Sequence, residues 1–89
     1  MKVLHLNDHY QLVGGAEVII FRMLEALEVQ GIRNVIVHQH PTNVTTEWRR
    51  VYEVPGLGDP YSQQSSVVAD TLRRILQEEK PDLIHIHDI

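Results

Sequence analysis

Lys2–Asn7 (KVLHLN), together with the helical stretch that follows it, decides the fold. Lys2–Asn7 is short, rich in apolar residues and followed at once by the acid Asp8, which predicts a buried β-strand. From Gly15 to Gln30 the chain reads GAEVIIFRMLEALEVQ, a helix-forming stretch with one narrow polar stripe. Gly31 stands where glycine commonly ends a helix. The chain therefore starts with a strand and a helix.

The rest of the sequence continues this alternation. Asn34–Gln39 and Val51–Val54 are short and contain β-branched residues, which predicts a second and a third strand. A second helix is predicted to begin near Asp59-Pro60 and to end at Lys80-Pro81, because the residue before a proline avoids the helical region. Asp82–His87 (DLIHIH) predicts the last strand.

Strands that alternate with helices predict the α/β class, with a Rossmann-like parallel sheet. Because crossovers between parallel strands are right-handed, the expected strand order is 3-2-1-4, with two main helices. The second strand has no helix after it, so one face of the sheet is expected to be only partly covered. The fourth strand has the composition of an interior strand but is left at an edge. We therefore expect residues 1–89 to be one incomplete domain, the front of something larger.

Composition excludes several classes of protein. Apolar residues make up 43 % of the 89 residues and charged residues 22 %, which is usual for a soluble globular protein. The absence of cysteine excludes disulfides and thiolate metal sites. No apolar run has the length of a membrane span and no signal peptide is recognised, so a cytoplasmic location is expected. The formal charge of −4 argues against nucleic-acid binding.

The candidate binding residues follow from the predicted topology. In open α/β sheets, ligands bind beyond the carboxyl ends of the strands where strand order reverses, which here is between the first and fourth strands. The first strand delivers Asn7, Asp8 and His9 to this point, and the fourth delivers His87 and Asp88. Gly14-Gly15 lie in the loop after the first strand. Paired glycines before a helix let a ligand approach the backbone, and the N–H groups of a helix start favour an anion. The pair is neither G-x-G-x-x-G nor a P-loop, which counts against NAD and ATP hydrolysis.

These residues also have interpretations without a ligand. Gly14-Gly15 fit a tight turn, and Asp88 fits the cap of a following helix. His85 leaves the strand on the same face as His87 but lies one step inside, so we expect a packed histidine hydrogen-bonded to its neighbours. Trp48-Arg49-Arg50 is expected to be an exposed loop with two solvated arginines.

Three stretches together resemble a known family. They are Met1–Asp8 (MKVLHLND), Gly14-Gly15-Ala16-Glu17 before an apolar helix, and Lys80–His87 (KPDLIHIH). Their order and spacing resemble the opening of a family 4 glycosyltransferase, of the large group 1 family with the GT-B fold. The resemblance spans the chain and is weakest from Pro41 to Tyr61. It implies that residues 1–89 are the truncated N-terminal, acceptor-side Rossmann-like domain of a two-domain enzyme.

The resemblance also implies a reaction, namely transfer of a sugar from a nucleotide-sugar donor to a glycan, lipid or small-molecule acceptor, with retention. Gly14 and Gly15 match the family's glycine-rich loop, and His87 matches the histidine that contacts sugar in the cleft. Asp8 and Asp88 are weaker candidates, and no catalytic residue is assigned. The family's donor site lies in a C-terminal domain, so we expect the 89 residues alone to be inactive. No cofactor or metal is expected, and any peripheral membrane contact is expected of the parent enzyme.

Two other functions stay open on the sequence. The first is a metal-binding module, because His38-Gln39-His40 and His85-Ile86-His87 are H-x-H pairs at strand ends. His5 and His9, which flank the central strand, add further imidazoles. The second is a non-catalytic interaction domain that self-associates through its open sheet edge. A phosphorelay receiver is disfavoured, since Val54-Pro55 stand where it requires an acid.

Overall fold

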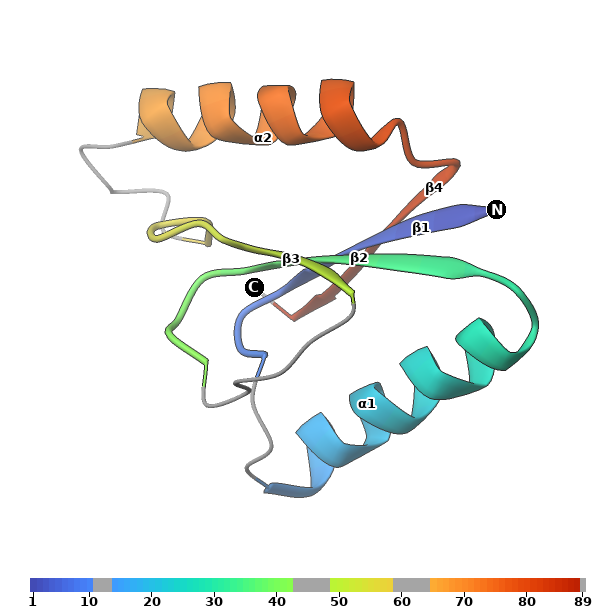
Figure 1. The fold of residues 1–89 in the computed structure, drawn as a ribbon. Coiled ribbons are helices and arrows are strands. Elements are labelled where there is room, and N and C mark those ends of the chain that lie inside the picture. Colours follow the sequence, from blue (N-terminus) through green and yellow to red (C-terminus); the bar gives the residue numbers. More distant parts are fainter. Residues whose placement is uncertain (11–13, 43–48, 59–64, 89) are drawn as a thin grey trace.

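Figure 1 shows the computed structural model of the chain, which describes residues 1–10, 14–42, 49–58 and 65–88, with the backbone alone at 14–17 and 88. In chain order the elements are β1 (Lys2–Asn7), α1 (Gly14–Val29), β2 (Arg33–His38), β3 (Arg50–Glu53), α2 (Ser65–Glu79) and β4 (Leu83–Asp88). The α/β class is confirmed, and the predicted strands and first helix agree with these bounds to within one residue. The predicted start of the second helix, near Asp59-Pro60, lies outside the described residues.

The strands form one parallel sheet in the order β3-β2-β1-β4, as predicted. In Figure 1, α1 lies on one side of this sheet and α2 on the other. The register of β1 against β4 runs from Val3↔Leu83 to Leu6↔Ile86 and then shifts, so that Asn7 lies opposite Asp88. The shift displaces the end of β4 by one residue, at the carboxyl end of the two strands.

The two faces of the sheet carry separate apolar clusters. The cluster on the α2 face consists of Leu4, Val35, Val37, Val54, Val68 and Ile75. The cluster on the α1 face consists of Tyr10, Leu24 and Ile36. Because successive strand side chains point to opposite faces, Leu4 joins the first cluster while His5 and Asn7 face α1. Both of these polar residues are buried.

The outer edge of β4 is apolar and exposed, as predicted. Leu83, Ile84 and Ile86 are 54 %, 47 % and 61 % exposed, although β4 pairs with the central strand β1. Self-association through this edge stays a prediction. Neither of the described helices has the length and hydropathy needed to cross a membrane.

Candidate functional site at the carboxyl edge

The predicted binding residues lie where the parallel strands end and α1 begins, which we call the carboxyl edge. Asp8 follows β1, Gly14 and Gly15 begin α1, and His87 and Asp88 end β4. Since β1 and β4 are parallel and α1 follows β1, these residues belong to the same edge of the sheet (Figure 1). The side chain of Asp88 and the surroundings of the two glycines lie outside the described part of the chain. The described side chains, Asp8 and His87, belong to two different clusters.

His87 belongs to a group of three histidines on the α1 face, with His5 from β1 and His85 from β4. Its Nε2 lies 2.8 Å from Nδ1 of His5, and the two rings stack with centroids 5.0 Å apart. The ring of His85 lies 3.9 Å from that of His87. The prediction that His85 is packed inside is wrong, because it is exposed on an edge strand. The buried member of the group is His5, on the central strand.

Asn34 on β2 fixes which nitrogen of His5 carries the proton. Its amide nitrogen donates to the Leu24 carbonyl at 3.1 Å and to Glu28 Oε2 at 3.0 Å. Its amide oxygen therefore faces His5 Nε2, at 2.7 Å, and accepts the proton of that nitrogen. His5 Nδ1 is then an acceptor, and His87 Nε2 donates to it. Neutral His87 thus has its other nitrogen, Nδ1, available as an acceptor.

Burial keeps His5 and His87 neutral at physiological pH. Burial lowers the pKa of His5, and the hydrogen bond to Asn34 only partly offsets that effect. Burial, with the nearby imidazoles of His85 and His5, lowers the pKa of His87 from 6.5 to about 4. At neutral pH His87 is therefore a hydrogen-bonding group without charge.

Folding stability is expected to fall as the pH is lowered from 6.5 to about 4. In this interval the unfolded chain binds protons at His5 and His87, whereas the lowered pKa of each residue keeps it neutral in the native protein. Protonation therefore favours unfolding. The contribution of His87 is complete above its unfolded pKa and lost as the pH falls through its native pKa. Urea unfolding across this interval measures the slope, and His87→Gln is expected to reduce it. An unchanged slope in His87→Gln contradicts the described environment of this ring.

The sequence placed Asn7 at the predicted binding edge without selecting it as a binding residue, and the structure makes it a candidate. It is 1 % exposed, and neither its amide oxygen nor its amide nitrogen has a hydrogen-bond partner among the described residues. Leaving such a group unpaired costs about 1–3 kcal/mol. A buried polar group without a partner in a native protein calls for an explanation, and a bound ligand or water is one. A polar amide at the last position of a predicted buried strand was the signal in the sequence.

Asn7→Leu is expected to raise the free energy of unfolding by about 1 kcal/mol. The reason is that folding removes the amide of Asn7 from water, and no described residue replaces the hydrogen bonds that it made there. Asn34→Leu is the matched control. The amide of Asn34 is hydrogen-bonded through both its oxygen and its nitrogen. Its removal leaves Nε2 of His5 without an acceptor and is expected to lower the free energy of unfolding by about 1–3 kcal/mol. Urea unfolding of both variants provides the comparison. A loss of stability in Asn7→Leu as large as that in Asn34→Leu would show that Asn7 is bonded.

Asp8 organises the loop after β2. Its carboxylate accepts a hydrogen bond from the side chain of Gln39, and Nε2 of His9 and of His40 each lie 3.3 Å away from it. Its backbone carbonyl accepts from the N–H groups of Gln39 and His40. The rings of His9 and His40 stack, with centroids 4.4 Å apart. Because the side chain of Asp8 is still 32 % exposed, its role in binding a ligand stays a prediction.

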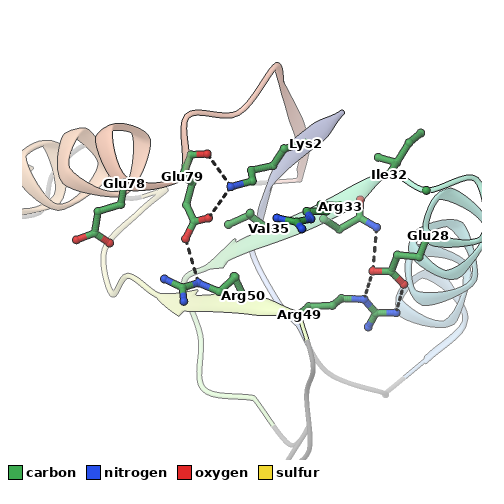
Figure 2. A pocket seen from close by; sticks show the side chains of 11 residues that line it. Lys2, Glu28, Ile32, Arg33, Val35, Arg49, Arg50, Glu78 and Glu79 are labelled. Atoms are coloured by element: carbon green, nitrogen blue, oxygen red, sulfur yellow. Dashed lines mark hydrogen bonds and ion pairs between the residues drawn. The ribbon is translucent and has the colours of Figure 1, made fainter.

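A pocket of about 690 Å³ lies at the opposite end of the strands, which we call the amino edge (Figure 2). Five of its charged side chains form ion pairs, namely Lys2, Glu28, Arg49, Arg50 and Glu79. Glu79, at the end of α2, accepts from Lys2 Nζ at 3.2 Å and from Arg50 Nε at 3.1 Å. Burial raises the pKa of Glu79, but its hydrogen bonds outweigh burial and leave that pKa below its ordinary value. We therefore assign this pocket a structural role, tying α2 to β1 and β3.

Arg49 also belongs to this pocket, and the prediction that it is solvated is wrong. Its side chain is 5 % exposed, and its Nε and Nη2 lie 2.6 and 2.9 Å from the Glu28 carboxylate. The reason is that the start of β3 lies beside α1, which presents Glu28. Arg50 is exposed, as predicted, with its Nε on Glu79.

The fold and the site define a Rossmann-like α/β unit whose candidate ligand residues stand at the carboxyl ends of its strands. Comparison of the sequence with known protein families matches residues 13–89 to Glycosyltransferase Family 4. The chain belongs to this family, as the resemblance of its motifs predicted. No curated protein matches the chain.

Proposed function

We propose that residues 1–89 form the N-terminal, acceptor-side part of a retaining glycosyltransferase that uses a nucleotide-sugar donor in the cytoplasm. Membership of the family supports sugar transfer in general. The observation that carries the finer proposal is the amide of Asn7, which has no hydrogen-bond partner among the described residues and lies at the same edge as neutral His87. The exposed apolar edge of β4 supports the inclusion of this unit in a larger domain.

The chemistry of the carboxyl edge suits hydroxyl groups. A sugar hydroxyl both donates and accepts, and the amide of Asn7 and the free Nδ1 of His87 offer both kinds of partner. A neutral imidazole with a pKa of about 4 is a weak base at neutral pH, so His87 is proposed to position a hydroxyl rather than to deprotonate it. The backbone N–H groups at Gly14 and Gly15, which begin α1, are proposed to face phosphate.

The distribution of positive charge supports the expectation that these residues need a partner domain for turnover. Departure of a nucleoside diphosphate requires groups that stabilise the developing negative charge. Within the described part of the chain, four cationic side chains line the amino-edge pocket, namely Lys2, Arg33, Arg49 and Arg50. They stand at the wrong end of the strands to reach a phosphate at α1. The proposal therefore assigns the donor site to a second domain.

The test is an NMR titration of the ¹⁵N-labelled 89-residue chain with UDP-glucose, GDP-mannose and their free sugars. Amide shifts are expected at Asn7, Gly14, Gly15 and His87. His87→Ala is expected to weaken binding about tenfold, the equivalent of one hydrogen bond of about 1.4 kcal/mol. His40→Ala, two residues after β2 and outside the histidine group, is the matched control.

The same samples are expected to show no release of nucleoside diphosphate, because the groups that stabilise it lie in the second domain. Shifts confined to the amino-edge pocket contradict the assignment of the carboxyl edge as the binding site. Turnover by the 89-residue chain alone contradicts the assignment of the donor site to another domain.

A further inference from the structure

The group formed by His5, His85 and His87 has the composition and the spacing of a metal site. One ring nitrogen from each residue lies within 4.8 Å of the other two. We propose that these three histidines bind one divalent transition-metal ion of the zinc type. The family resemblance implies sugar transfer without a metal, so this ion has a role separate from transfer, and the proposal does not rest on the proposed function.

The distance between the ring nitrogens of His5 and His87 needs only a small change to suit a metal ion. Zinc binds imidazole nitrogen at about 2.0–2.1 Å in tetrahedral geometry, which places two such nitrogens about 3.3 Å apart. Nδ1 of His5 and Nε2 of His87 are 2.8 Å apart, so an ion between them opens this pair by about half an ångström. His85 and His87 are on an edge strand, and His85 is exposed, so its ring has room to turn. His5 is buried and provides the fixed ligand.

The hydrogen bonds prepare His5 for this role. Its Nε2–H is committed to Asn34, so its Nδ1 carries a lone pair that points toward the other two histidines. His87 needs only to move its proton from Nε2 to Nδ1, which exchanges one neutral form for the other. Its Nδ1–H then faces away from the ion and donates to a hydroxyl, so metal and sugar do not exclude each other.

A hydrogen bond that orients the ring of His5 distinguishes this group from a chance gathering of surface histidines. Metal-bound histidines usually donate their second N–H to an oxygen that orients the ring. His5 does so to Asn34, and Asn34 is itself held by Glu28, whose carboxylate also binds Arg49. The exposed side of His85 leaves a fourth position for water or another ligand.

The ligand set also selects the ion. Three imidazoles with neither carboxylate nor thiolate favour zinc, copper or nickel over calcium or magnesium. A second group of possible ligands among the described residues consists of Asp8, His9 and His40. Its carboxylate already accepts from Gln39, and all its members are at least partly exposed. His38, from the other H-x-H pair, belongs to neither group, and its Nδ1 donates to the His40 carbonyl at 2.6 Å.

The test uses the 89-residue chain without a polyhistidine tag, titrated with zinc chloride by calorimetry and with cobalt chloride by visible absorption. One ion per chain is expected, with the absorption of tetrahedral cobalt. His85→Gln is expected to weaken binding by at least about tenfold. Its native side chain is exposed, so this variant is expected to fold, and circular dichroism checks that it does. His40→Gln, a member of the second group, is the matched control and is expected to bind as the wild type does.

Each other outcome overturns the proposal. An absence of zinc binding at millimolar concentration excludes the site. A loss in His40→Gln equal to or larger than that in His85→Gln assigns the ion to the second group. More than one ion per chain with octahedral cobalt indicates scattered surface binding. Because the titrant is the metal alone, failure here leaves the sugar-binding proposal standing, and failure of the sugar titration leaves this one standing.

Discussion

A histidine buried in the centre of a parallel sheet needs a partner for each ring nitrogen, and His5 finds them in Asn34 and His87. An unmade bond at such a position costs about 1–3 kcal/mol, a large part of the stability of a small domain. Through Asn34 the same chain of hydrogen bonds reaches Leu24 and Glu28 on α1. It therefore joins α1, β2, β1 and β4, and it passes through the polar face of the central strand.

The two ends of the sheet, on either side of this chain of hydrogen bonds, differ in their chemistry. The amino edge is charged: Glu28 pairs there with Arg49, just before β3, and Glu79 pairs with Arg50 and Lys2 (Figure 2). At the carboxyl edge, His87 is neutral and Asn7 has no partner among the described residues. The first end holds the elements together, whereas the second has hydrogen-bonding capacity left for a ligand. This division supports the placement of carbohydrate at the carboxyl edge.

The architecture could be predicted from the sequence because its signals are local. Apolar strands such as Lys2–Asn7, a helix closed by Gly31 and the stop at Lys80-Pro81 each depend on a few neighbouring residues. The handedness of crossovers then gave the strand order. The errors concern contacts between distant residues. Arg49 meets Glu28 across 21 positions, and Asn34 reaches His5 across 29. The pattern H-x-H in β4 identified a strand with a candidate site, but it could not show that His85 is exposed and His5 is buried. That difference depends on whether a strand has neighbours on both sides, as β1 does, or lies at the edge, as β4 does.

The central claim is that Asn34 fixes the protonation of His5 and, through it, that of His87. Imidazole ¹⁵N NMR at neutral pH measures this directly. The account predicts that both rings are neutral with the proton on Nε2, and that a scalar coupling crosses the hydrogen bond from His87 Nε2 to His5 Nδ1. A His5 ring protonated on Nδ1, or a charged His5, would contradict it.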